Sequence, residues 1–108
     1  MRPLKPDCSP AQRVFETARR IPRGQVAAYG QLGQACAPPV DARTVGRIMA
    51  FCPAGIPWWR VVASDGRLAI AKRSPELAAL QRARLEEEGV RFIQDGRVGM
   101  EAHRTHSL

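Results

Sequence analysis

The sequence has 108 residues, which suits one domain with a single modest core, and its 44% hydrophobic and 25% charged residues are ordinary globular values. The formal net charge of +7 points to a polyanionic partner, with nucleic acid first and an anionic membrane surface second. No apolar run approaches membrane-spanning length and no signal-like stretch opens the chain, so we expect a cytoplasmic protein without a membrane partner, associated with the nucleoid if bacterial.

The first predicted helix follows a flexible arm of residues 1–8. Ser9 is expected to cap it, Pro10 to occupy its first turn and Gln12 to complete a capping box. One apolar face recurs at helical spacing, through Ala11, Val14, Phe15 and Ala18. We expect this helix to end near Arg20, because Pro22 and Gly24 follow.

Two further short helices are predicted after an extended stretch over 25–28. The second should run from Tyr29 to about Ala37, and the third from Ala42 to about Phe51 with Asp41 as its cap. Two short helices joined by a tight connection are typical of a helix-turn-helix, in which the second helix reads the nucleic acid.

This reader helix has two different faces. Its core side is predicted to carry Val45, Ile48, Met49 and Cys52, and its opposite side Arg43, Gly46, Arg47 and Ala50. A face of small and basic side chains suits close approach to nucleic acid. An ordinary solvated basic face is the alternative.

Two adjacent tryptophans, Trp58 and Trp59, follow Pro57 and precede a β-branched run. If the backbone is extended here, neighbouring side chains point to opposite faces. One indole could then face the core while the other lines a cleft. The alternative is that both are core anchors.

A small hairpin, or wing, is expected next, with strands over 60–63 and 67–71 and a turn at 64–66. A fourth helix should start at Ser74 and Pro75, end near Glu88 before Gly89, and point three leucines inward: Leu77, Leu80 and Leu85. A last hairpin is predicted from strands over 90–93 and 98–100. Residues 101–108 are expected to form a polar tail.

Metal chemistry and disulfides are not expected. The three cysteines, Cys8, Cys36 and Cys52, are odd in number and widely spaced, without a Cys-x-x-Cys pair. His103 and His106 lie in the expected tail, and we interpret them as part of a solvated terminus. We therefore predict no metal and no cofactor.

Four segments occur in the order found in one known family. They are Ile21-Pro22-Arg23-Gly24-Gln25-Val26-Ala27-Ala28-Tyr29, Ala42-Arg43-Thr44-Val45-Gly46, Pro57-Trp58-Trp59-Arg60-Val61 and Leu85-Glu86-Glu87-Glu88-Gly89-Val90. They resemble the Ile-Pro-x-Gly-x-Val-x-x-Tyr, Ala-Arg-x-Val-Gly, Pro-Cys-His-Arg-Val and Leu-x-x-Glu-Gly motifs of the O6-alkylguanine-DNA alkyltransferases. The resemblance extends from about Ser9 to Phe92. Each motif alone is weak, but four in the right order are specific.

Trp58 stands where those enzymes have the acceptor cysteine, which is the mark of the alkyltransferase-like proteins. The stretch Ile70-Ala71-Lys72-Arg73 also resembles that subfamily. Cys52-Pro53 stands in place of the enzymes' Asn-Pro. Trp59 stands where the enzymes have histidine and most subfamily members a polar residue, so it departs from both.

The resemblance implies the fold class: mainly α with small β hairpins, a winged helix-turn-helix-like domain as in the C-terminal domain of the alkyltransferases. One such domain would span 1–108. It also implies a lesion pocket and a DNA-binding surface. The pocket would comprise Tyr29, Pro57, Trp58 and Arg73, and the DNA-binding residues would be Tyr29, Arg43, Thr44, Gly46 and Arg47.

By the same resemblance, the protein would bind duplex DNA containing O6-alkylguanine, flip the damaged base and mark it for nucleotide excision repair proteins. Tyr29 would crowd the phosphate, Arg43 would fill the gap in the stack and Arg73 would lie against the flipped base. Neither indole replaces a thiolate and its base, so no catalysis is expected. We expect a monomer.

Two alternatives remain open from the sequence. One is a helix-turn-helix regulator that binds undamaged DNA by sequence. The other is a residual alkyltransferase that uses Cys52 or Cys36.

Overall fold

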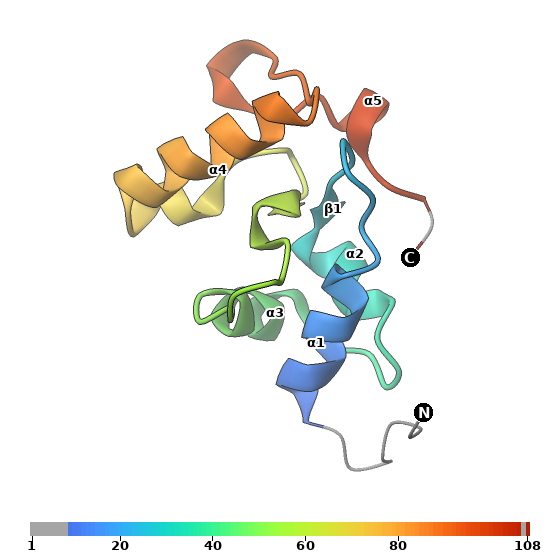
Figure 1. Cartoon of the computed structure of the whole chain (residues 1–108). Coiled ribbons are helices and arrows are strands. Elements are labelled where there is room, and N and C mark those ends of the chain that lie inside the picture. The colour runs from blue at the N-terminus through green and yellow to red at the C-terminus, as the bar shows by residue number, and fades with distance from the viewer. Residues whose placement is uncertain (1–8, 107) are drawn as a thin grey trace.

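The computed structural model describes residues 9–106 and 108 and is mostly helical (Figure 1). The expected arm, with Cys8, lies outside these residues. The elements run in the order α1 Pro10–Ala18, β1 Ala27–Ala28, α2 Tyr29–Gln34, α3 Ala42–Met49, η1 Trp58–Arg60, β2 Val61–Val62, η2 Ala69–Lys72, α4 Pro75–Glu87, η3 Gln94–Gly96 and α5 Met100–His103, where η marks a 3₁₀ turn. None of the described helices has the length and apolarity to cross a membrane.

A two-stranded parallel pair divides the interior into two clusters. Ala27 of β1 lies opposite Val61 of β2, and Ala28 lies opposite Val62. Because successive strand residues point to opposite faces, Val61 enters one buried cluster and Val62 the other. The first cluster joins this pair to α1, α2 and α3, and the second joins it to α4 and the C-terminal segments (Figure 1).

The predicted helix starts are confirmed. Ser9 and Gln12 form the capping box of α1, the Asp41 side chain accepts the Thr44 N–H at α3, and Ser74 caps α4. The helices end two or three residues earlier than predicted, at Ala18, Gln34 and Met49. The last turns tighten into i to i+3 bonds, such as the one from Phe51 N–H to the Ile48 carbonyl, and this shortens each α-helical span.

The predicted wing hairpin is wrong. Val61 and Val62 pair with β1 in parallel, and residues 69–72 form a 3₁₀ turn instead of a returning strand. Both valines are buried, which suits an internal strand covered on two faces. Gly66 closes the turn at φ +91°, and a Cβ there would lie 2.5 Å from the Val98 carbonyl oxygen, so the turn packs against the C-terminal segment.

The predicted inward face of α4 is correct only for Leu85, which is fully buried. Leu77 and Leu80 are 42% and 41% exposed, and Gln81 is buried in their place. The Gln81 amide donates to the backbone carbonyls of Trp59 and Val61 at 3.2 and 3.1 Å, which satisfies a polar group that burial would otherwise penalise.

The second predicted hairpin forms only in part. The chain reverses at Asp95 and Gly96, both at positive φ, but a single antiparallel bridge joins Phe92 to Val98. Met100 then begins a short helix, so no second strand extends beyond the bridge.

The C-terminal segment is not a solvated tail, which corrects the interpretation of His103. Both ring nitrogens of His103 are engaged, one by the Arg91 N–H at 3.0 Å and the other at 3.2 Å from the Gly24 carbonyl. Thr105 is fully buried and its N–H donates to the Val26 carbonyl. His106 is exposed, as expected. The segment therefore runs beside β1 and closes the second cluster.

Candidate nucleic-acid interface

A cavity of about 400 Å³ opens beside α3. Its apolar lining includes Met49, Trp58, Val61 and Ile70, and its polar and charged lining is Tyr29, Arg43, Arg47, Arg73 and Gln81. The lining comes from α2, α3, η1, β2, η2 and α4. Six of the residues expected from the sequence to contact DNA or a lesion therefore line one cavity. They are Tyr29, Arg43, Gly46, Arg47, Trp58 and Arg73.

The α3 helix turns its small and basic face to this cavity. Val45 and Met49 are buried on the core side, while Arg43 and Arg47 are exposed. This confirms the two faces predicted for the reader helix. A Cβ added at Gly46 would meet no atom within 4 Å, so the surface is open at that point.

Thr44, which the resemblance implies as a DNA-binding residue, lies in the first turn of α3. Its hydroxyl donates to one Asp41 carboxylate oxygen at 2.6 Å and its N–H to the other at 3.0 Å, and it does not line the cavity. These hydrogen bonds lower the pKa of Asp41. Thr44 therefore helps to fix the start of α3.

The three arginines of the cavity are free of ion pairs within residues 9–106 and 108. Arg43, Arg47 and Arg73 have no carboxylate partner there, whereas other arginines, such as Arg60, do. They are also exposed. Unpaired cations around an apolar cavity create a positive field that suits a phosphate backbone.

Tyr29 is the first residue of α2 and is partly buried at the cavity wall. Burial raises the pKa of its phenol, so the hydroxyl stays protonated at neutral pH. A neutral phenol at this position can donate a hydrogen bond to an anionic oxygen.

The two tryptophans diverge, although they lie in a 3₁₀ turn and not on the extended backbone expected. Three residues per turn separate neighbouring side chains by about 120°. Trp58 lines the cavity and packs on the first core cluster, while Trp59 packs on the second. The ring centroids are 6.1 Å apart and the rings are nearly perpendicular, at 87°.

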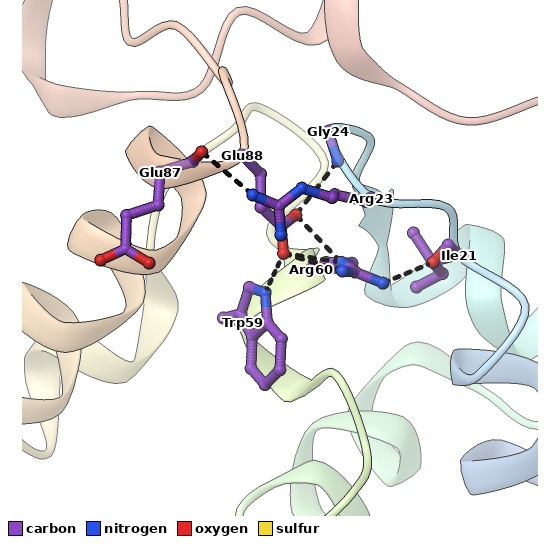
Figure 2. Close-up of polar contacts among 7 residues, drawn as sticks. All are labelled: Ile21, Arg23, Gly24, Trp59, Arg60, Glu87 and Glu88. Carbon is purple, nitrogen blue, oxygen red and sulfur yellow. Dashed lines mark hydrogen bonds and ion pairs between the residues drawn. The ribbon is translucent and has the colours of Figure 1, made fainter.

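Behind this turn, the Glu88 carboxylate accepts hydrogen bonds from three residues in two segments, the loop at Gly24 and the η1 turn (Figure 2). Trp59 Nε1 donates to Oε2 at 2.9 Å, the Gly24 N–H donates to Oε1 at 3.1 Å, and the Arg60 guanidinium contacts both oxygens. A further Arg60 nitrogen donates to the Ile21 carbonyl at 2.9 Å. The Glu88 side chain is 4% exposed.

The chemistry of Glu88 follows from these donors. Burial alone would raise the pKa of Glu88, but the hydrogen bonds from Arg60, Gly24 and Trp59, with the Arg60 charge, outweigh it and lower the pKa to about 2. Glu88 is thus a permanent carboxylate near neutral pH. Its Trp59 partner can donate a hydrogen bond but cannot accept a proton, so this pair cannot relay one.

One residue expected in the lesion pocket lies outside the cavity lining, and two residues that were not expected lie in it. Pro57 is buried next to η1 and does not line the cavity. Gln81 and Ile70 do line it. Gln81 had a detectable signal, because it falls four residues before Leu85 on the buried side of α4. The predicted strand over 67–71 gives no such signal for Ile70, which lies in the 3₁₀ turn η2.

The cysteines lie away from the cavity lining among the described residues. Cys36 is buried, with its thiol 3.4 Å from the Leu32 carbonyl oxygen. Burial raises the pKa of Cys52 to about 11. A thiol of this pKa is about one part in ten thousand thiolate at pH 7, which makes it a poor nucleophile.

Comparison with known protein families identifies the family of this chain. Residues 9–90 match the family described as "6-O-methylguanine DNA methyltransferase, DNA binding domain". The chain belongs to this family. The family domain accounts for most of this chain.

Named relatives of the family domain include a "DNA base-flipping protein" of Escherichia coli (strain K12), which is 34% identical over 95 residues, covering 86% of this chain and 71% of that protein. A "Bifunctional methyltransferase/endonuclease" of Thermoplasma volcanium is 33% identical over 85 residues, which are 77% of this chain but 24% of that protein.

Solved structures of family members have a similar fold. S. pombe Atl1, in complex with damaged DNA containing O6-carboxymethylguanine, superposes with a TM-score of 0.76 at 27% identity, covering 89% of this chain and 94% of that one. The crystal structure of a variant of Mycobacterium tuberculosis OGT has a TM-score of 0.65 at 30% identity, covering 79% and 51%. These neighbours fit a winged-helix-like fold and group the chain with the alkyltransferase-like members.

Because the surface at Gly46 is open, we predict that Gly46→Leu raises the stability of the protein but weakens its binding to DNA. Leucine is a better helix former than glycine and nothing obstructs it, so the free energy of unfolding should rise by about 0.5–1 kcal/mol. The same side chain would project into the cavity, so affinity for duplex DNA should fall at least about tenfold. Urea denaturation and fluorescence anisotropy measure the two effects.

The matched control for Gly46→Leu is Ala83→Leu, on an exposed part of α4 outside the cavity lining. It should leave DNA affinity unchanged. Full DNA affinity in a stable Gly46→Leu protein would contradict this assignment of the surface.

The lowered pKa of Glu88 predicts a pH-dependent stability. Its charged form stabilises the fold fully above the ordinary glutamate pKa of 4.5, and this stabilisation is lost as pH falls from 4.5 towards 2. Glu88→Gln should therefore cost about 3 kcal/mol at pH 7 and progressively less below pH 4.5, measured by urea denaturation at each pH.

Glu87→Gln is the control for this pH series, because the Glu87 side chain is exposed and points away from the cluster (Figure 2). It should change stability little at any pH. A Glu88→Gln deficit that stays constant from pH 7 to pH 3 would show that the ionised carboxylate is not what stabilises the fold.

Proposed function

We propose that this protein is a non-enzymatic sensor of O6-alkylguanine in duplex DNA. The observation that carries the proposal is the Trp58-lined cavity, which opens on the exposed basic face of α3 among three arginines without ion-pair partners in residues 9–106 and 108. Its volume of about 400 Å³ lies within the range of roughly 300–1,000 Å³ that small-molecule pockets have.

Base flipping gives each part of the cavity a role. Tyr29, at the first turn of α2, would press on the phosphate and favour rotation of the nucleotide out of the stack. Arg43 would enter from the minor groove and fill the space left behind. Trp58 would then face the flipped base, since extruded bases are bound by stacking on aromatic and apolar side chains.

Arg73 would contact the opposite side of the flipped base. It follows η2 directly, and η2 supplies Ala69 and Ile70 to the same cavity. A guanidinium over an aromatic face contributes about 0.5–2 kcal/mol, depending on how far it is desolvated. The alkyl group itself would pack on the apolar lining. Larger alkyl groups would therefore be accepted up to the volume of the cavity.

The absence of catalysis follows from the nucleophiles at hand. Transfer of an alkyl group needs a thiolate beside the flipped base, and the cavity offers the Trp58 indole there. Cys52 has its pKa raised to about 11, and neither it nor Cys36 lines the cavity. The lesion would therefore be held without being repaired.

The wider role rests on the resemblance to the alkyltransferase-like proteins. We propose that a bound lesion is marked for nucleotide excision repair proteins and that the protein acts as a monomer in the cytoplasm, on the nucleoid of a bacterial cell. The relatives named for base flipping and for a complex with damaged DNA support the DNA-binding part of this role.

Lesion preference is the first expected result. Affinity for a duplex with O6-methylguanine should exceed affinity for the same undamaged duplex, and both should fall with salt by roughly 0.9 log units per log unit for each phosphate contact. A radiolabelled methyl group on the lesion should stay on the DNA. Equal affinities for damaged and undamaged duplexes across several sequence contexts would refute the sensor proposal.

Arg43 and Arg47 provide a charge-matched pair of variants on the same face of α3. Arg43→Ala should reduce affinity for the lesion duplex more than affinity for the undamaged one, because it removes a side chain that fills the stack. Arg47→Ala should weaken both by a similar factor, as expected for loss of a phosphate contact. Titrations by anisotropy on both duplexes decide between these outcomes, and identical effects of the two variants would reduce Arg43 to a backbone contact.

A further inference from the structure

Trp59 has no role in the mechanism proposed above, because it does not line the cavity. It is nevertheless held by contacts at its indole nitrogen, its backbone carbonyl and its ring. Its indole N–H donates to Glu88, its backbone carbonyl accepts from the Gln81 amide, and its ring packs on the second core cluster. Two guanidinium groups lie over the ring, Arg84 at 4.7 Å and Arg60 at 5.5 Å from its centroid.

This set of contacts exceeds what burial of an indole requires. The only polar atom of the ring is satisfied by an ionised carboxylate, and both ring contacts with guanidinium groups are cation–π in geometry. Figure 2 shows the indole extending from η1 with its nitrogen directed at the Glu88 carboxylate. These contacts restrain the orientation of the Trp59 ring.

Trp58 packs against the Trp59 ring. The two indoles meet nearly at right angles with their centroids 6.1 Å apart, so any rotation of one ring moves the surface against which the other packs. Trp58 is only partly buried, and its exposed part lines the cavity. The ring that would contact a flipped base is thus supported from behind by a ring that is itself fixed by Glu88.

We propose that Trp59, held by Glu88, is a positioning residue that fixes the ring of Trp58 and so sets how strongly the cavity prefers an alkylated base. This inference rests on the proposed function. In the alkyltransferases that the chain resembles, a histidine occupies the position of Trp59 and serves proton transfer. Here the hydrogen bond between Trp59 and Glu88 fixes the position of the Trp59 ring instead.

The consequence separates specificity from general DNA affinity. In the proposed mode Arg47 contacts a phosphate and Arg43 fills the base stack, and neither arginine is a hydrogen-bond partner of Glu88. Loosening the Trp59–Glu88 pair should leave those contacts intact. It should, however, lower the complementarity of the cavity for the lesion, and so reduce the ratio of lesion to undamaged affinity.

The test uses the complete protein with Trp59→Phe, Glu88→Gln and Glu87→Gln. Trp59→Phe keeps an aromatic ring but removes the indole N–H donor together with one of the two fused rings, while Glu88→Gln keeps the side-chain size and removes the charged acceptor. Glu87→Gln changes the net charge by the same amount as Glu88→Gln, but at an exposed side chain, so it controls for long-range electrostatics. Thermal unfolding establishes that each variant is folded at the temperature of the binding assay.

For each variant, dissociation constants are measured for matched duplexes with guanine and with O6-methylguanine. Trp59→Phe and Glu88→Gln should each reduce the lesion preference about tenfold, which is the lower end of what loss of one charge-assisted hydrogen bond costs. Affinity for undamaged duplex should change less than about threefold, and Glu87→Gln should change neither value.

Nuclear magnetic resonance of the indole N–H groups gives a second readout without DNA. The Trp59 N–H should exchange slowly with solvent in the wild type and rapidly in Glu88→Gln, with a shift of the Trp58 indole signal that Glu87→Gln does not produce. This signal reports on the orientation of Trp58 even if Glu88→Gln is too unstable for titration.

The outcomes are distinguishable from failure of the proposed function itself. A wild-type protein without lesion preference would refute the sensor. A wild-type protein with lesion preference that both variants retain in full would overturn only this inference. Equal losses on the two duplexes would also overturn it, because they would show a role in stability and none in discrimination.

Discussion

The buried carboxylate of Glu88 joins three segments that are distant in the sequence: the loop at Gly24, the η1 turn and the end of α4. Each contact is charge-assisted, and the Arg60 side chain that neutralises it also donates to the Ile21 carbonyl. A buried ion pair of this kind is costly to break, because either partner alone would be an uncompensated charge. The hydrogen bonds and ion pair of Glu88 therefore fix the two core clusters relative to each other at the point where the tryptophans diverge.

The same contacts decide what the site can do chemically. A carboxylate bound only by donors, with its pKa lowered to about 2, has no proton to give and no neighbour that would accept one from it. With tryptophans at both central positions of the motif, neither of these two side chains offers a thiolate or a proton-accepting nitrogen. What remains is an apolar cavity with a basic rim, which is an arrangement suited to binding.

The sequence predicted those features that depend on residues close together in the chain, namely the helix starts and the two faces of α3. The capping residues Ser9, Asp41 and Ser74 and the two faces of α3 follow from side chains that act within one or two turns. The pairing of β2 was not predictable in this way, because Val61 and Val62 suit a hairpin and a buried parallel pair equally well, and their partner lies more than 30 residues earlier. The buried Gln81 and the ordered C-terminal segment likewise depend on partners outside their own elements.

The central claim is that a damaged base leaves the duplex and enters the Trp58 cavity. A crystal structure of the protein bound to a duplex with a single O6-methylguanine tests it most directly. We predict an extrahelical O6-methylguanine between Trp58 and Arg73, with the Arg43 side chain in the gap it leaves. A bound complex in which the modified base remains stacked in the duplex and the cavity holds no base would contradict the account.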